Sequence, residues 1–538
     1  MCGILWIGIV LIACVFGQTG PVVDTSVGQI VGLKDEFIKF LGIPYAVVDV
    51  NDPFGLAKPH PPFNTPYFAN KDPVVCPQIY KDIVQGNIQC LHLNIYKPNN
   101  EYQNKTLPVM VFIHGGGFRE GDGNLKTYSP IFLIKHDVMV VTVNYRLGPY
   151  GFLCLEQDEY SNQGLKDQIL ALKWIKKNIK QFGGDEENIL LFGHSAGSAS
   201  IDFHLLFKEE KVYNKVILQS VEMVSLLLID EPKNNDSLAN ITSKLGIDSK
   251  DLKTVDMIKE LSKINTELII SMTKNDNFRP CVHNLIIGDK MKRNNFKDMK
   301  IIIGNAEKEA LFFYTGVVNY TNMIEMELNK HFTNIPEKGV TKAENFYLTG
   351  NLKYNTIDFG CDLYFNYPAI RSIRHYLRNN ATVYRYLFTY DGGRNYIKVR
   401  DGIDAEGATH GDELGYLFDA DLFGDTITAA DQSVIDTITT FWTNFAKYGN
   451  PTPEDLSSST WPKIDDNLEF YMNILSHPVL ERRYREKEMV FWDSFYKDFG
   501  VYSTGHRFPE EAEFMKNRAP QLGIMISLNV AVVLIRYV

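Results

Sequence analysis

The sequence lacks the segments that usually separate one domain from the next. No Gly/Ser tract, proline-rich run, block of like charges or internal repeat interrupts its 538 residues. A composition of 45% hydrophobic and 22% charged residues is typical of a globular protein with a large core. Length alone favours several domains, but large α/β sheets are a common exception. We therefore predict one large domain with insertions.

Basic residues are too few for a protein that binds nucleic acid. The chain has 55 Lys and Arg against 65 Asp and Glu, and its formal net charge is −10. Nucleic-acid binding requires a basic surface, so this partner class is excluded. The seven cysteines also lack the spacing of a zinc site, and we predict no metal.

Long apolar runs are confined to the two ends of the chain. Residues 4–16 are apolar, too short for a membrane span and of the right length for a signal h-region. We predict a signal peptide at residues 1–17, cleaved near Gln18, although no Lys or Arg precedes the run. The alternative is a buried N-terminal strand. The mature domain is then expected over residues 18–505.

The C-terminal tail, residues 506–538, holds the second apolar run at 522–535. This run is short for a span. Small residues at 503–505 suit the attachment site of a lipid anchor, although the spacer that follows is longer than usual. The alternatives are an anchored tail and a tail that packs on the domain or frays.

Five sequons accompany the predicted signal peptide and fit an exported glycoprotein. They are the predicted glycosylation sites Asn104, Asn235, Asn240, Asn319 and Asn380.

The cysteines are also compatible with export. Signal-peptide cleavage would remove two of the seven and leave Cys76 and Cys90 as a close pair, in a setting where disulfides persist. Cys154, Cys281 and Cys361 have apolar or aromatic neighbours. We predict that these three are buried thiols, because a free cysteine behaves as a small hydrophobe.

Strands alternate with helices along the chain. Apolar runs predict strands near residues 108–113, 138–145, 189–192, 216–219, 300–304 and 383–388. Apolar residues at helical spacing predict helices at 167–182 and 434–445, and Gly183 ends the first of them. This order predicts an α/β fold with a large, mostly parallel sheet flanked by helices. Residues 254–273 and 321–331 are expected to form helical cap insertions over the site.

The strongest motif is a strand, a sharp turn and a helix at residues 188–203. Residues 193–197, GHSAG, fit the G-x-S-x-G pattern of a nucleophile elbow. In that turn the flanking glycines avoid a clash, and the serine Oγ is lifted clear of the sheet. Ser195 is therefore the candidate nucleophile. The Ala196 N–H, at the helix N-terminus, points to where an oxyanion would develop.

A second motif, HGGG at residues 114–117, directly follows the strand predicted at 108–113. Successive glycines allow a substrate carbonyl to approach the backbone closely. Gly116, Gly117 and Ala196 would together form a three-donor oxyanion hole. His114 is expected to orient this loop rather than to carry protons.

The remaining partners must be a base and an acid that come later in the chain. His410 is the base candidate, because it lies on a glycine-flanked loop after the strand at 383–388. Glu309 is the acid candidate after the strand at 300–304, and Glu307 is its rival. Asp412 and Glu413 are disfavoured because they are too near His410 in sequence. A carboxylate is needed to hold the imidazole in one tautomer.

With these residues in place, the chain resembles the type-B carboxylesterases, the α/β-hydrolase family that includes the cholinesterases. Matching segments occur along nearly the whole mature length, among them FLGIPYA (40–46), VFIHGGGF (111–118), VNYRLGPYGFL (143–153), GNAEKEALFF (304–313) and THGDELGYLF (409–418). The segments CLHLNIY and GFLCL further resemble insect esterases, in particular lepidopteran antennal ones.

The resemblance implies roles for residues that the sequence alone left open. It selects Glu309 over Glu307 as the acid and His410 as the base. It also pairs Cys76 with Cys90 around a short loop.

The chain departs from the family pattern at several positions. Ala310 and Val221 replace two glycines and are expected to narrow the site or to shift a turn. Pro53 and Ile88 replace both members of a charge pair, so no unpaired buried charge is left.

Two further departures bear on the substrate. Residues 77–89 lack the Trp that holds quaternary ammonium in cholinesterases. In addition, His194 replaces the Glu that precedes the nucleophile. We do not expect cholinesterase activity.

The sequence thus predicts a secreted or surface-exposed serine carboxylesterase that needs no cofactor. The resemblance implies small, fairly apolar substrates, such as odorant, pheromone or xenobiotic esters. The alternatives are a non-catalytic adhesion or binding protein of the same fold and a juvenile-hormone-type esterase. The first would have lost catalytic residues, which are all present here.

Overall fold

The computed structural model describes the chain from residue 20 to residue 499 with gaps. The described residues are 20–99, 105–155, 160–206, 211–222, 225, 236–281, 296, 298–316, 320–332, 335–454, 460–465, 468 and 470–499. The predicted signal peptide, the C-terminal tail and the sequons at Asn104, Asn235 and Asn319 lie outside these residues. Asn240 and Asn380 are described, and both are exposed.

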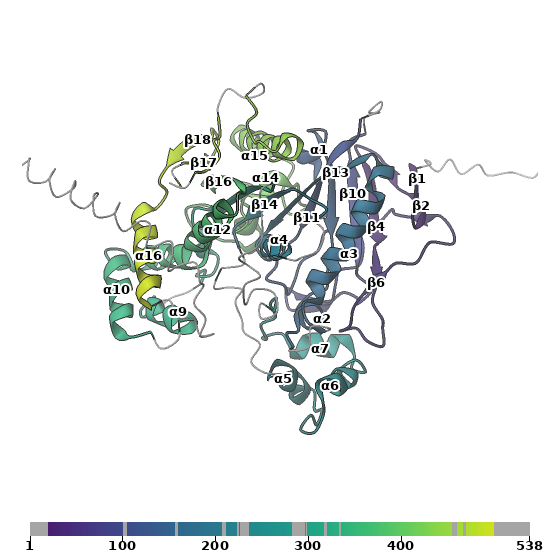
Figure 1. Ribbon diagram of the computed structural model, residues 1–538, viewed down its shortest axis with the longest axis horizontal. Helices are drawn as coiled ribbons and strands as arrows, with labels where there is room; N and C mark the ends of the chain where they lie inside the picture. Colours follow the sequence, from purple (N-terminus) through teal and green to yellow (C-terminus); the bar gives the residue numbers. More distant parts are fainter. Residues whose placement is uncertain are drawn as a thin grey trace, which may run out of the picture.

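An 11-stranded sheet forms the centre of the molecule (Figure 1). Its middle strands run parallel, from β12 through β11, β13, β14, β15 and β16 to β17, and antiparallel strands complete both edges. In spatial order the strands are β18 (Val479–Arg482), β17 (Phe470–Ile474), β16 (Thr382–Phe388), β15 (Lys300–Ala306), β14 (Lys215–Gln219), β13 (Gly184–His194), β11 (Leu107–Ile113), β12 (Met139–Val143), β10 (His92–Lys97), β4 (Ile38–Pro44) and β3 (Leu33–Lys34).

The central strands are buried on both faces, which explains why they read as continuous apolar runs. On β11, Val109 and Val111 belong to one hydrophobic cluster, whereas Met110 and Phe112 belong to another. Side chains alternate between the two faces of a strand, so the two clusters are two cores separated by the sheet.

Helices cover both of these cores. One face carries α3 (Gln163–Asn178), α4 (Ala196–Leu206) and α12 (Tyr367–Arg378), of which α3 and α4 lie in front of the sheet in Figure 1. The other face carries α1 (Ile131–Ile134), α14 (Leu414–Leu417) and α15 (Ala429–Tyr448). None of the helices in the described part of the chain has the length and hydrophobicity needed to cross a membrane.

The predicted helical insertions differ in part from the observed ones. Residues 254–273, expected as one helix, form α6 (Thr254–Leu261) and α7 (Thr266–Met272). The break occurs because the side chain of Asn265 accepts a hydrogen bond from the Glu267 N–H and so caps a new helix. Residues of α7 border the pocket described below, whereas α9 (Met323–His331) contributes none to its lining.

Two disulfides link segments around the site. Cys76 is bonded to Cys90. Cys154 is bonded to Cys281, so the prediction that these two cysteines are buried thiols was wrong. They are separated by 127 residues, and nothing local in the sequence indicates that the fold brings them together. Cys361 is a buried free thiol, as predicted.

We expect the two disulfides to contribute unequally to stability, because a bridge that closes a longer loop removes more entropy from the unfolded chain. In the chain-entropy picture, Cys154–Cys281 stabilises by about 5 kcal/mol and Cys76–Cys90 by about 3 kcal/mol. The paired Cys→Ser variants, compared by urea unfolding, should therefore show the larger loss for Cys154 and Cys281. A smaller loss than in the Cys76/Cys90 variant would contradict this order.

Candidate active site

The candidate nucleophile Ser195 occupies the turn between β13 and α4. Its φ of 57° lies in a region that residues other than glycine rarely adopt. The Ser195 N–H donates to the Gln219 carbonyl on β14 (2.9 Å), and the Ala199 N–H donates to the Ser195 carbonyl (3.0 Å). A Cβ at Gly197 would lie 1.9 Å from the Ile113 carbonyl oxygen, so glycine is required there. The Ser195 side chain is partly exposed to the pocket.

The glycine turn after β11 faces this serine. Gly116 and Gly117 have φ values of 107° and 60°. The Gly116 carbonyl accepts from the Arg119 and Glu120 N–H groups, which closes the turn. Neither Gly116 nor Gly117 uses its own N–H in a backbone hydrogen bond with the described residues. Ala196 is the first residue of α4, where an N–H has no acceptor inside the helix.

His114 supports the glycine turn from behind. Its side chain is buried, its Nδ1 lies 2.8 Å from the Gly115 carbonyl, and its ring stacks on Tyr145 at 4.5 Å. Burial lowers the pKa of His114 to about 4, so the ring is neutral at pH 7. Both properties suit a residue that orients the loop.

The candidate acid and base meet directly. The His410 Nδ1 lies 2.7 Å from the Glu309 Oε2. The other carboxylate oxygen of Glu309 accepts a hydrogen bond from the Ala306 N–H (2.7 Å), and the Glu309 side chain is fully buried. A carboxylate held in this way fixes which ring nitrogen carries the proton and leaves Nε2 of His410 to face the pocket.

The loops that carry these two residues are tied to each other. The Lys308 N–H donates to the Ala408 carbonyl (2.8 Å). The Thr409 hydroxyl donates to the Lys308 carbonyl (3.2 Å) and accepts from the Phe312 N–H (2.9 Å). The acid loop follows β15 and the base loop follows the neighbouring strand β16, so sheet topology brings them together.

The rival carboxyls lie elsewhere. Glu307 forms no hydrogen bond or ion pair with His410 in the described structure. The Asp412 carboxylate accepts from the N–H groups of Thr409, Ile397 and Lys398 and is fully occupied in holding the loop. Burial raises the pKa of Asp412 to about 6.

Glu413 is a second carboxyl close to Glu309, the candidate acid. It is fully buried, and its Oε1 accepts from the Gln219 side-chain amide at 3.1 Å. Burial and the negative charge of Glu309 raise the pKa of Glu413 to about 8, so it is mostly protonated at pH 7.

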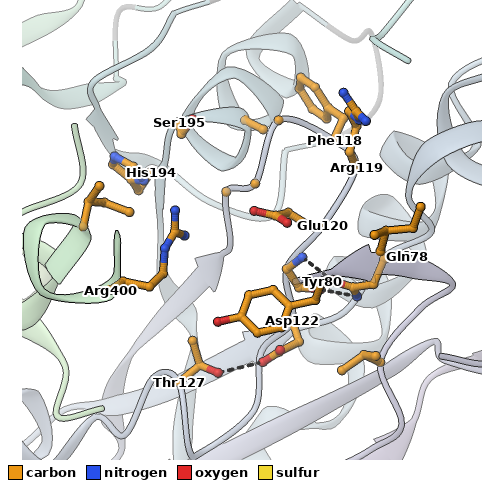
Figure 2. A pocket seen from close by; sticks show the side chains of 18 of the residues that line it. Gln78, Tyr80, Phe118, Arg119, Glu120, Asp122, Thr127, His194, Ser195 and Arg400 are labelled. Atoms are coloured by element: carbon orange, nitrogen blue, oxygen red, sulfur yellow. Dashed lines mark hydrogen bonds between the residues drawn. The ribbon is translucent and has the colours of Figure 1, made fainter. Parts of the chain in front are cut away.

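One pocket of about 1190 Å³ collects the candidate residues (Figure 2). Ser195, His410 and the three expected oxyanion donors Gly116, Gly117 and Ala196 all line it. No hydrogen bond joins Ser195 to His410 within the described residues. Such bonds are often long without substrate and tighten when it binds.

His194, which precedes the candidate nucleophile Ser195, packs against the candidate base His410. The two imidazole centroids are 4.4 Å apart. Burial, with smaller contributions from His410 and Arg400, lowers the pKa of His194 well below its usual range. Its Nε2 is buried and has no hydrogen-bond partner among the residues that the structure describes. The position that holds a Glu in cholinesterases therefore presents a neutral ring here.

Val221 and Ala310, which stand where the family pattern has glycine, are accommodated in different ways. Val221 is buried and lines the pocket, so its side chain narrows the site, as expected. Ala310 is fully buried, and its N–H donates to the Cys361 Sγ at 3.3 Å. Its side chain therefore packs in the protein interior and does not line the pocket.

Sequence reasoning missed the charged residues that line the pocket: Lys81, Arg119, Glu120, Asp122, Lys126, Lys274, Arg279, Arg400 and Asp421. Glu120 and Arg400 are two of them (Figure 2). Glu120 lies only three residues after Gly117, and that closeness to the glycine turn was a usable signal. Arg400 carried no local signal, because its place in the pocket depends on tertiary packing. Among the described residues, no three His, Cys, Asp or Glu side chains are grouped as ligands for a metal ion.

The sheet order and the strand–serine–helix turn define an α/β-hydrolase. The model of the carboxylesterase family matches residues 19–492, and the chain belongs to this family. The predicted family and fold class are thereby confirmed.

The relatives and a solved structure agree with this assignment. The chain is 29% identical to a juvenile hormone esterase of Tribolium castaneum, over 82% of this chain and 85% of that protein. It is 28% identical to carboxylesterase 1E of Mus musculus, over 88% and 93%. A crystal structure of juvenile hormone esterase from Manduca sexta, with OTFP covalently attached, covers 88% of this chain and 99% of its own with a TM-score of 0.77 and 26% identity. The chain is a carboxylic ester hydrolase.

We expect Glu413→Gln to change how stability depends on pH. Because the pKa of Glu413 is raised on folding, the folded state holds its proton more tightly, and the free energy of unfolding falls as pH rises from about 4.5 to 8. The amide removes this contribution. Urea unfolding at pH 5 and pH 8 should show a wild-type loss that exceeds the variant's by about 1 kcal/mol or more.

The control for this experiment is Glu337→Gln, which removes one exposed negative charge from α10 (Glu337–Tyr347). Parallel pH profiles of the wild type and Glu413→Gln would contradict the expectation.

Proposed function

We propose that the protein is a serine carboxylesterase that hydrolyses small, fairly apolar esters through an acyl-enzyme. The observation that carries the proposal is the 2.7 Å contact between His410 and Glu309 at a pocket that also contains Ser195 and the glycine turn. The covalent adduct of the Manduca sexta relative fits chemistry of this type.

In the proposed mechanism, Ser195 Oγ attacks the ester carbonyl carbon while His410 Nε2 takes the hydroxyl proton. Glu309 orients His410 and stabilises the imidazolium. The N–H groups of Gly116, Gly117 and Ala196 bind the developing oxyanion, which in a protease is worth about 10²–10³ in rate per donor. His410 then gives its proton to the leaving alcohol.

Water then hydrolyses the acyl-enzyme. His410 removes a proton from the water molecule, the resulting hydroxide attacks the acyl carbon, and the carboxylic acid leaves as Ser195 recovers its proton. No cofactor takes part.

The substrate class follows from the walls of the pocket and remains a proposal. Phe118, Val221, Phe312, Phe313 and Leu414 line it and favour apolar acyl or alcohol groups. Odorant, pheromone and xenobiotic esters are the candidates, in line with the resemblance to lepidopteran antennal esterases. A hormone-directed esterase is the second candidate, because two relatives are named juvenile hormone esterases. Turnover of a juvenile-hormone ester against that of a simple acetate separates the two.

Export is part of the proposal. The Cys76–Cys90 and Cys154–Cys281 bonds require an oxidising compartment to persist. Asn240 and Asn380 are exposed and thus accessible to glycosylation. Anchoring at the cell surface through residues 506–538 remains an alternative to release.

The nucleophile is tested by Ser195→Ala beside Ser198→Ala. Ser198 lies on α4, three residues after Ser195, and its buried Oγ has no hydrogen-bond partner among the described residues, so its loss is a matched control. With a chromogenic acetate, we expect wild-type turnover, a loss of about 10⁶-fold in kcat for Ser195→Ala, and near-normal rates for Ser198→Ala. Organophosphate should label the wild type and Ser198→Ala only. Absence of turnover and labelling in a folded wild type would favour a non-catalytic binding protein.

The acid is tested by two variants on one loop. Glu309→Gln keeps the shape of the side chain but holds His410 in the wrong tautomer, and we expect kcat to fall by about 10⁴-fold. Glu307→Gln should stay within a few-fold of the wild type. Steady-state kinetics with the same acetate measure both. The reverse order would transfer the role of the acid to Glu307.

A further inference from the structure

Two opposite charges face the pocket and have no role in the proposed mechanism. Glu120 follows the glycine turn, and its N–H donates to the Gly116 carbonyl at 3.1 Å. Arg400 comes from α13 (Tyr396–Asp401) on the other wall. Figure 2 shows the Glu120 carboxylate and the Arg400 guanidinium pointing toward the same space, near Ser195.

The Glu120 carboxylate has unused acceptor capacity. The residue is half-buried, and no side-chain hydrogen bond or ion pair to it is formed within the described part of the chain. Burial raises the pKa of this carboxyl, which shows that water solvates it only partly. Its neighbour Arg119 is directed elsewhere, with a hydrogen bond to the Lys274 carbonyl.

Arg400 is held in place but retains free donors. Its Nε and Nη2 donate to the two carboxylate oxygens of Asp401 at 2.7 and 2.8 Å. This two-point contact fixes the plane of the guanidinium. Its Nη1 has no hydrogen-bond partner among the described residues. Arg400 therefore presents oriented N–H groups rather than a mobile charge.

The two groups attract each other, yet they do not form an ion pair. The space between an acceptor and a donor therefore suits a group that can donate to one and accept from the other. An ammonium ion can only donate and a carboxylate can only accept, so neither can serve both groups. A hydroxyl does both and carries no charge.

We propose that Glu120 and Arg400 form a polar subsite that binds a hydroxyl group of the substrate. This inference rests on the proposed function and narrows its substrate class to apolar esters that bear one hydroxyl. The hydroxyl proton is donated to the Glu120 carboxylate, and its oxygen accepts from Arg400 Nη1. The ester carbonyl lies at Ser195.

The first test compares each hydroxy ester with the ester that lacks only its hydroxyl. The monoacetates of butane-1,3-diol and butane-1,4-diol carry the hydroxyl on the alcohol side and are compared with butyl acetate, and butyl 4-hydroxybutanoate carries it on the acyl side and is compared with butyl butanoate. We expect at least one hydroxy ester to exceed its counterpart in kcat/KM by about tenfold or more, mainly through KM, since a hydrogen bond to a charged group is worth about that factor. Equal or lower values for all three would overturn the subsite.

The second test follows, in variants, the ratio of kcat/KM between the preferred hydroxy ester and its counterpart without the hydroxyl. Glu120→Ala and Arg400→Gln should each lower this ratio by about tenfold, because each removes one hydrogen bond. Glu120→Gln should retain part of the preference, since its amide oxygen still accepts. Asp421→Ala removes an exposed carboxylate from the rim of the same pocket and should leave the ratio unchanged. A ratio that survives Glu120→Ala would overturn the assignment.

Ester binding to the Ser195→Ala variant tests the polar subsite without turnover. Calorimetry with this variant should give a lower Kd for the preferred hydroxy ester than for its counterpart, and adding Glu120→Ala should abolish the difference. Equal affinities would overturn the subsite even where the wild type is an active esterase. Failure of the wild type to hydrolyse butyl acetate, together with a clear affinity difference, would contradict the proposed function and leave the subsite supported.

Discussion

The close approach between the start of α4 and the end of β11 is the constraint on which the site depends. Gly197 lies so near the Ile113 and His114 carbonyls that no side chain fits between them. This contact forces Ser195 into its left-handed conformation and sets the serine beside the glycine turn. Because β11 and β13 are neighbours in the sheet, the nucleophile and the expected oxyanion donors are positioned by backbone packing rather than by flexible side chains.

The opposite wall of the pocket is built in a different way. Glu309 begins a short 3-10 helix just after β15, and His410 lies in a loop that follows β16 and α13. Hydrogen bonds between these two segments hold them together. The carboxyls around them are mostly satisfied by the backbone or kept neutral by burial, as Asp412 and Glu413 illustrate. Keeping Glu413 mostly protonated at pH 7 avoids a buried negative charge without a partner beside Glu309, which would be costly.

The features that could be predicted from the sequence are those that depend on local order. The elbow, the glycine turn and the stop at Gly183, which ends the 3-10 turn that follows α3, each follow from a few consecutive residues. The break between α6 and α7 also has a local cause, because Asn265 caps α7. The sequence analysis instead predicted one helix over residues 254–273. The Cys154–Cys281 bond and the meeting of Glu120 with Arg400 could not be predicted, because both depend on contacts between residues far apart in the chain.

The order of the strands also bears on when the protein becomes active during its synthesis. A ribosome releases β11 and β13 first, with the nucleophile and the oxyanion turn, and the loop after β16 much later. Domains form as units when enough of the chain is available, and the proposed base belongs to the last third of this one. The proposed site therefore gains its proposed base, His410, only after most of the sheet has been synthesised.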